Sequence, residues 1–163
     1  MRQPVESRIG QILKMHNKTL SAAESCTGGR ISHLITTVSG SSQYYLGSVT
    51  SYAIPVKEKV LGVSGEVIRD KGVVSQEVAA QMAEGVRKVT GSDYSVATTG
   101  LAEGGDEHYP EGTVCMAVCS PEKTVTRVFQ CHSNRKGNIR LFTNAALRFL
   151  EEILIKELDN QVK

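Results

Sequence analysis

Residues 19–29, Thr-Leu-Ser-Ala-Ala-Glu-Ser-Cys-Thr-Gly-Gly, pass from a strand to a helix within a few positions, and this step decides the fold. Positions 19–24 predict a short strand. The glycine pair Gly28 and Gly29 then opens a helix that we expect to extend to about Val38. A strand followed directly by a helix is typical of α/β proteins with parallel strands.

The rest of the chain continues this pattern. Hydrophobic spacing predicts further helices over 3–16, 55–61, 65–70, 76–89 and 135–158, and strands over 46–52, 94–99, 112–119 and 124–131. Ser75 is expected to cap the fourth of these helices, and a turn at 120–123 joins the last two strands as a hairpin. This order predicts an α/β fold, a three-layer α/β/α sandwich with a mixed, mostly parallel sheet. The length of 163 residues suits a single domain over 1–163.

Composition narrows the classes of function. Hydrophobic residues make up 40% of the chain and aromatic residues 5%, so the core must consist mainly of Val, Ile, Leu and Ala. A net charge of +2 argues against a dedicated nucleic-acid binder, which usually presents a basic face. No apolar run approaches the roughly 18 residues of a membrane helix, and the N-terminus carries no apolar run of a signal peptide. We therefore expect no nucleic-acid partner and no membrane partner.

The cysteines are Cys26, Cys115, Cys119 and Cys131. Without a signal peptide, the simplest interpretation is reduced thiols in the cytoplasm. Cys115 and Cys119 lie in one predicted strand, where alternation points both side chains to the same face. We interpret them as small buried hydrophobic residues and expect no metal site, because zinc would need further ligands nearby.

Three predicted strands end in polar or glycine residues, at Glu24-Ser25, at Tyr52 and at Thr99-Gly100. In open α/β sheets, ligands bind at the carboxyl ends of parallel strands. We therefore expect a site where these three ends meet.

Ser25 is the candidate nucleophile. The bare N–H groups at a helix start carry partial positive charge, so those of Cys26, Thr27, Gly28 and Gly29 could stabilise an oxyanion while Ser25 attacks a carbonyl. The alternative is that Ser25 or Thr27 only caps the helix.

A serine nucleophile needs a base. The histidines lie outside the strand ends, although His108 falls in the polar loop 100–112 and stays a candidate. Lys57 follows Tyr52 by five positions, and a lysine with a lowered pKa can act as base. The alternatives are a solvated Lys57 and a Tyr52 that only packs.

Two other residues could hold a substrate. The hydroxyl of Thr99 can orient it, and Gly100 permits a sharp turn after the strand. Arg135 starts the last predicted helix and suits fork-like contacts with phosphate or carboxylate. The alternative for Arg135 is a surface ion pair.

Residues 21–29, which include Ala-Glu-Ser-Cys-Thr-Gly-Gly, resemble the signature of the CinA C-terminal domain family. Other matching segments keep the order of the family, and the similarity spans about residues 5–150. These segments are 40–42, 47–52, Lys57 with 61–63, 72–75, 82–85, 99–100, 112–114, and Arg135 with 138–139.

The resemblance implies an activity and assigns roles. Members are known as nicotinamide mononucleotide deamidases, which hydrolyse the nicotinamide amide to give nicotinate mononucleotide and ammonia. It implies an α/β/α fold, no metal or other cofactor, a small-molecule nucleotide substrate and a homo-oligomer. By position, the serine of the family corresponds to Ser25, its tyrosine and lysine to Tyr52 and Lys57, its threonine to Thr99 and its late arginine to Arg135. In this hypothesis Tyr52 relays or holds the serine proton that Lys57 takes.

Two departures from the family pattern keep two alternatives open. Ile54-Pro55 replace the usual Asn-Glu, and the loop 100–112 is shorter and more acidic than the family loop. An acidic side chain beside a phosphate would repel it. The chain could therefore be an inactive nucleotide-binding module of the same fold, or an amidase for another small amide.

Overall fold

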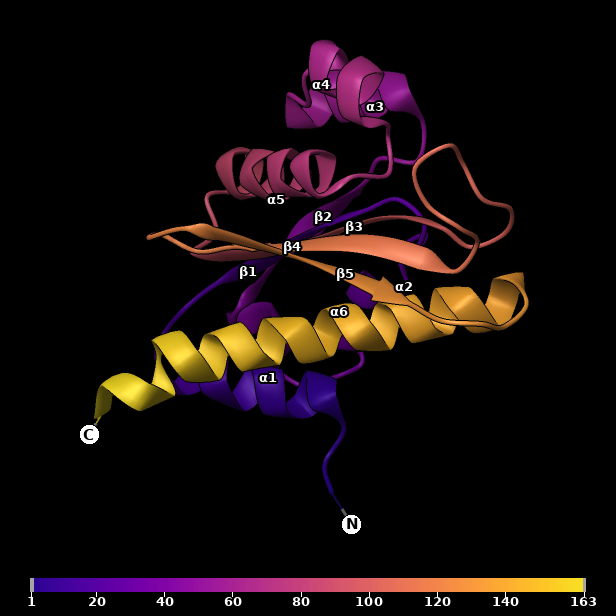
Figure 1. Ribbon diagram of the computed structural model, residues 1–163. Coiled ribbons are helices and arrows are strands. Elements are labelled where there is room, and N and C mark those ends of the chain that lie inside the picture. Colours follow the sequence, from indigo (N-terminus) through magenta and orange to yellow (C-terminus); the bar gives the residue numbers. More distant parts are fainter. Residues whose placement is uncertain (1, 163) are drawn as a thin grey trace.

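The computed structural model describes residues 2–162 (Figure 1). The elements that concern the site and the core are α1 (Val5–Met15), β1 (Leu20–Glu24), α2 (Arg30–Thr36), β2 (Tyr45–Thr50), α3 (Ile54–Leu61), α4 (Gly65–Lys71), α5 (Gln76–Thr90), β3 (Tyr94–Leu101), β4 (Thr113–Cys119), β5 (Thr124–Gln130) and α6 (Arg135–Glu157). Short 3₁₀ turns occupy Ser41–Gln43 and Asp159–Val162. The predicted order of helices and strands is confirmed.

The strands form one five-stranded sheet in the order β2-β1-β3-β4-β5. β1 pairs in parallel with β2 on one side and with β3 on the other. β4 is antiparallel to both β3 and β5, so four strands run in one direction and β4 runs against them. The mixed, mostly parallel sheet is therefore as predicted.

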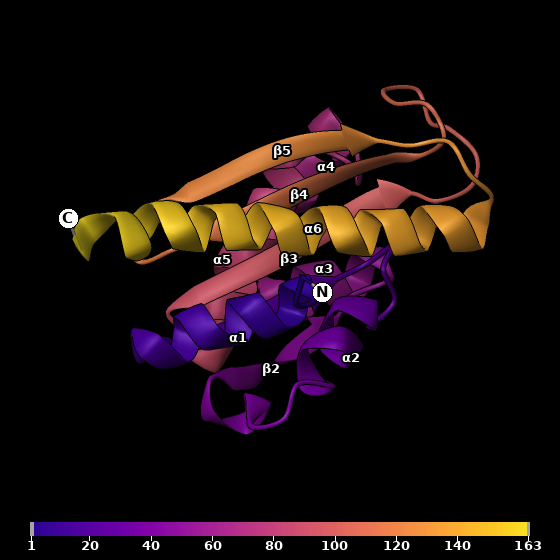
Figure 2. The ribbon, with the colours of Figure 1, turned by 90° about the horizontal axis from the view of Figure 1, so that it is seen from below.

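Helices cover both faces of this sheet. α3, α4 and α5 lie on one side, and α1 and α6 lie on the other (Figure 1). Figure 2, seen from below, shows α1, α2 and α6 side by side in front of the sheet. The predicted three-layer α/β/α sandwich is confirmed.

Strand β4 carries apolar side chains on both faces of the sheet, so both faces need a layer of helices. Val114, Met116 and Val118 join the core on the α1 and α6 side. Alternate residues join the core on the α5 side, and these are Cys115, Ala117 and Cys119. A strand that is apolar on both faces is typical of a sheet buried between two helix layers. Cys115 and Cys119 are buried, free and on the same face, as predicted.

Two predictions concern the ends of helices and strands, and the structure confirms one of them and corrects the other. The Ser75 side chain accepts a hydrogen bond from the backbone N–H of Val78 and so caps α5, as predicted. The prediction of a turn at Gly100 is wrong, because β3 continues through Gly100 to Leu101 in register with β4. A Cβ at Gly100 would lie 2.8 Å from the carbonyl oxygen of Thr113 and 3.0 Å from Cys26 Sγ. Close packing, not a turn, requires this glycine.

None of the helices within residues 2–162 combines the length and the apolar character needed to cross a lipid bilayer.

Candidate active site

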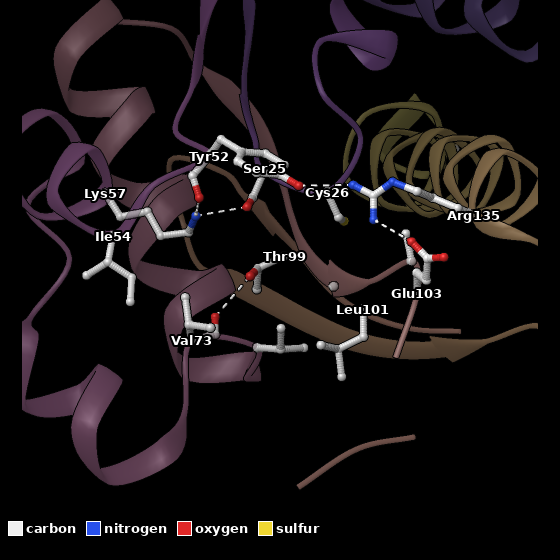
Figure 3. Close-up of a pocket in the computed structure, with 13 residues that line it drawn as sticks. Ser25, Cys26, Tyr52, Ile54, Lys57, Val73, Thr99, Leu101, Glu103 and Arg135 are labelled. Atoms are coloured by element: carbon white, nitrogen blue, oxygen red, sulfur yellow. Dashed lines mark hydrogen bonds and ion pairs between the residues drawn. The ribbon is translucent and has the colours of Figure 1, made fainter. Parts of the chain in front are cut away.

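A cavity of about 350 Å³ lies where β1, β2 and β3 end (Figure 3). The predicted strand-end residues Ser25, Tyr52 and Thr99 all line it. Lys57 reaches it from α3, and Arg135 reaches it from the first turn of α6. The structure thus has a cavity at the carboxyl ends of the parallel strands, where ligands bind in sheets of this kind.

At the inner end of the cavity, Lys57 Nζ lies 2.8 Å from Ser25 Oγ. The amine also donates to the backbone carbonyl oxygen of Ser51, and to that of Tyr52 at 3.1 Å. Lys57 is only 1% exposed and Ser25 is 8% exposed. The amine is therefore held by the two carbonyls and directed at the hydroxyl.

Burial lowers the pKa of Lys57 to about 8. A neutral amine has two N–H groups and one lone pair. The two N–H groups match the carbonyls of Ser51 and Tyr52, which leaves the lone pair to accept the hydroxyl hydrogen of Ser25. This arrangement is suited to a general base that activates a serine.

Ile54 lines the same cavity as Lys57. It occupies the first position of α3, and Pro55 follows in the first turn, where a missing N–H costs nothing. The replacement of the Asn-Glu pair of the family therefore leaves the helix that carries Lys57 intact.

The thiol next to Ser25 is not a competing nucleophile. Cys26 is buried, and burial raises the pKa of its thiol to about 12. The thiolate is the reactive form of cysteine, so Cys26 stays protonated and inert near neutral pH.

The turn after β1 offers backbone donors. Within residues 2–162, no acceptor contacts the N–H of Cys26, of Thr27 or of Gly29, and of these three residues only Cys26 lines the cavity. The N–H of Gly28 donates to the carbonyl of Ser25 at 3.0 Å and is therefore occupied. Gly28 and Gly29 have φ angles of 59° and 99°, a left-handed region that favours glycine. The two glycines therefore give the turn its shape.

Thr99 and Val73 form the wall opposite Lys57 (Figure 3). The hydroxyl of Thr99 donates to the backbone carbonyl of Val73 at 2.9 Å. With its hydrogen committed, this oxygen can only accept further hydrogen bonds. An N–H donor, such as the NH₂ group of a carboxamide, is the partner that Thr99 suits.

The outer end of the cavity carries the charges. Arg135 Nη2 donates to the hydroxyl of Tyr52 at 3.0 Å, and Nη1 lies 3.5 Å from a carboxylate oxygen of Glu103. Figure 3 shows this guanidinium between the two groups. The buried amide of Asn138 fixes the start of the acidic loop, because Nδ2 donates to the carbonyl of Ala102 at 2.9 Å.

The model of the CinA C-terminal domain matches residues 2–154. The chain belongs to the CinA C-terminal domain family. A CinA-like protein from Salinibacter ruber is 46% identical over 145 residues, which are 88% of this chain and 35% of that protein. A CinA-like protein from Cytophaga hutchinsonii is 41% identical over 152 residues, which are 92% of this chain and 36% of that protein. The chain thus spans about a third of the length of these curated relatives.

Solved structures of CinA superfamily proteins have the same fold. A competence-damaged protein (CinA) superfamily protein from Klebsiella pneumoniae superposes with a TM-score of 0.90 at 25% identity, over 93% of this chain and 96% of that chain. One from Escherichia coli gives a TM-score of 0.88 at 27% identity, over 93% and 88% of the two chains.

Of the residues predicted from the CinA signature, the structure brings Ser25 and Cys26 to the cavity and leaves three outside its wall. Thr27 is buried beneath the turn, and Gly28 and Gly29 shape it. The prediction that the N–H of Gly28 is open to an oxyanion is wrong, because that group is already bonded.

The phenol of Tyr52 does not lie where a proton relay needs it. The contact between Tyr52 and Lys57 is made by the backbone carbonyl, whereas the hydroxyl bonds to Arg135. His108 is exposed beside Gly72 and does not line the cavity.

Sequence reasoning missed two carboxylates of this CinA domain. Glu24 is fully buried next to Ser25, and Glu103 lines the cavity beside Arg135. A charged residue at the end of a short strand of small and apolar residues was the available signal for Glu24. For Glu103, only the acidic character of the loop gave a signal. Within the described residues, no group of three or more His, Cys, Asp or Glu side chains could hold a metal ion.

Proposed function

We propose that the chain is an amidohydrolase that deamidates nicotinamide mononucleotide to nicotinate mononucleotide and ammonia. One observation carries the proposal: the Nζ of buried Lys57, whose pKa is lowered to about 8, lies 2.8 Å from Ser25 Oγ. The resemblance to the deamidase family supports the identity of the substrate.

In the first half of the reaction, Ser25 Oγ attacks the carboxamide carbon and its proton passes to Lys57 Nζ. The N–H group of Cys26, a residue that lines the cavity, is the candidate to meet the oxyanion, since it has no other acceptor in the described chain. Thr99 accepts a hydrogen bond from the NH₂ group of the substrate. When the C–N bond breaks, Lys57 returns the proton to the leaving nitrogen and ammonia departs.

In the second half, water attacks the acyl-serine ester. Lys57 takes a proton from the water and returns it to Ser25 Oγ as the acid leaves. Arg135 holds the phosphate or ribose end at the outer cavity. No step needs a metal or another cofactor.

Ammonia release and nicotinate mononucleotide formation by the pure protein test this proposal, with Ser25→Ala as the control. Release by the wild type and none by Ser25→Ala is the expected result. Equal rates for both proteins would contradict it. Tight nucleotide binding in calorimetry without any turnover would instead favour the inactive binding module.

A second candidate is an amidase for a carboxamide without a phosphate. The specific observation is Glu103, whose carboxylate forms an ion pair with Arg135 at the end of the cavity where a phosphate would bind. A panel of carboxamides with and without phosphate, compared by kcat/KM for ammonia release, separates the two candidates.

We also propose that the chain acts as a homo-oligomer in the cytoplasm. Family resemblance supports the assembly, and four free cysteines suit a reducing compartment. Light scattering on the pure protein tests the oligomer.

A further inference from the structure

Glu24 is the last residue of β1 and precedes the proposed nucleophile directly. Its side chain is 0% exposed. The carboxylate accepts hydrogen bonds from the backbone N–H of Ile31 at 2.8 Å and of Ser32 at 3.0 Å. It also accepts one from the hydroxyl of Thr27 at 2.7 Å. The charge therefore faces α2 and makes no contact with Lys57.

All three partners of Glu24 are donors, and this fixes the kind of side chain that the position needs. An ionised carboxylate is an acceptor only, with room for several hydrogen bonds. A glutamine would turn an NH₂ group toward one of the donors and leave that donor unpaired, which is costly inside a protein. The N-cap residue of α2 is Gly29, which has no side chain that could cap the helix. The carboxylate at the end of the preceding strand does so instead.

Thr27 extends this contact to the neighbouring strand. Its hydroxyl hydrogen goes to Glu24, so the hydroxyl of Thr98 must donate to Thr27, at 2.9 Å. The backbone N–H of Ser25 also donates to the carbonyl of Thr98, at 3.1 Å. The turn that begins at Ser25 is thus fixed on one side by the carboxylate and on the other by β3.

This turn carries the reacting groups. Ser25 Oγ lies on it, as does the N–H group of Cys26, which lines the cavity and has no acceptor within residues 2–162. We propose that Glu24 is a positioning residue that holds the hydroxyl of Ser25 and the oxyanion donor, the N–H of Cys26, in one fixed geometry through Thr27 and the start of α2. This inference rests on the proposed function, and it adds a role for a residue that touches neither substrate nor Lys57.

The test compares Glu24→Gln, Thr27→Val and Thr27→Ser with the wild type, using kcat, KM, the pH profile and thermal unfolding. A displacement of about 1 Å can reduce a rate by about 100-fold. We expect Glu24→Gln to lower kcat by about 10- to 100-fold per folded molecule, with KM within about twofold. Thr27→Val should lower kcat less, and Thr27→Ser should restore it because the hydroxyl returns. The apparent pKa of kcat/KM should not move, because Glu24 does not contact Lys57.

Asp93→Ala is the matched control, because it removes an acceptor that lies far from the cavity. Asp93 Oδ2 accepts the backbone N–H of Thr19 at 2.9 Å and its hydroxyl at 3.0 Å, at the opposite end of β1 and β3. This change should lower the melting temperature and leave kcat per folded molecule unchanged. A purely structural Glu24 would behave in the same way, and that result would overturn the positioning role. A shifted pH profile in Glu24→Gln would overturn it too, in favour of direct electrostatic action on Lys57.

Labelling of Ser25 by a fluorophosphonate, followed by intact mass, separates this inference from the proposed function. Labelling that is fast in the wild type and slow in Glu24→Gln supports the positioning role even if the mononucleotide is not the substrate. A wild type that neither turns over nor becomes labelled would overturn both proposals, since Ser25 would then have no reactivity to be positioned. Equal labelling and equal kcat in the two proteins would overturn the positioning role alone.

Discussion

Arg135 and Tyr52 are 83 positions apart in the chain, and Arg135 Nη2 donates a 3.0 Å hydrogen bond to the hydroxyl of Tyr52. The bond joins the start of α6 to the segment after β2 across the outer end of the cavity (Figure 3). The phenol therefore orients the guanidinium, while the backbone of the same tyrosine holds the amine of Lys57.

Replacement of Tyr52 by phenylalanine separates these two contacts. Tyr52→Phe removes the hydroxyl and keeps the backbone carbonyl, so Lys57 should keep its partners. We expect KM for nicotinamide mononucleotide to rise about 3- to 10-fold, with kcat and its pH profile nearly unchanged. Steady-state kinetics measure this split. A fall of kcat by 100-fold with unchanged KM would instead support a proton relay through the phenol.

The pH dependence follows from Lys57. The base is the neutral amine, and burial lowers the pKa of Lys57 to about 8, so the active form accumulates as the pH rises. Because pH 7 lies one unit below this pKa, only about a tenth of the molecules carry the neutral amine at that pH. We expect kcat/KM to rise about tenfold from pH 7 and to level off above pH 8 to 9.

Lys57→Met should remove this titration together with the activity. Lys59→Met is the control, because Lys59 lies on the same helix but is exposed. A flat profile between pH 6 and 9 in the wild type would show that Lys57 is not the base in the step that kcat/KM reports.

The acidic loop gives a prediction about substrate choice. Glu103 lies 3.5 Å from Arg135 and lines the cavity, so its negative charge opposes a phosphate there. Both side chains are substantially exposed, which weakens the effect through solvent screening. We expect Glu103→Gln to raise kcat/KM for the mononucleotide by about 3- to 10-fold and to leave that for the phosphate-free riboside within about twofold.

Glu107→Gln tests whether this effect is local. Glu107 lies in the same loop with an 88% exposed side chain and does not line the cavity. Glu107→Gln should leave kcat/KM unchanged for both substrates, at low and at high salt. If Glu103→Gln also had no effect on the ratio of the two substrates, the acidic loop would have no part in selecting them.

The sequence was sufficient for the fold because the deciding signals are local. Apolar runs of strand length, helical spacing and glycine breaks give the order of elements, and the rule for parallel sheets then places Ser25 and Thr99 at one edge. Lys57 could be proposed because it follows a strand end by one short helix turn. These are properties of neighbouring positions in the chain.

The direction of individual side chains could not be obtained in this way. Whether Tyr52 offers its carbonyl or its phenol to Lys57 depends on the backbone path after β2, and the partner of the phenol comes from α6. Glu24 stands beside Ser25 in sequence, yet its carboxylate faces the start of α2. Each of these facts is set by packing between elements, which one-dimensional spacing does not contain.

Gly100 links the fold to the site and gives a final prediction. Its Cα lies in β3, where an added Cβ would approach the carbonyl oxygen of Thr113 to 2.8 Å and Cys26 Sγ to 3.0 Å. The carbonyl belongs to the paired strand β4 and cannot move without disturbing the sheet. Overpacking of this kind typically costs about 1–3 kcal/mol. We therefore expect Gly100→Ala to lower the free energy of unfolding by about that amount, measured by denaturant titration.

The same change should also lower kcat, because the contact with Cys26 pushes on the turn that carries Ser25 and the oxyanion donor. We expect a loss of about tenfold per folded molecule at a temperature where the variant is fully folded. Gly65→Ala is the matched control, since a Cβ there meets only the ends of the flexible Arg69 and Glu58 side chains, at 3.3 Å. It should keep both stability and kcat. A Gly100→Ala variant as stable and as active as the wild type would show that β3 and the turn can separate by several tenths of an ångström without consequence for the reaction.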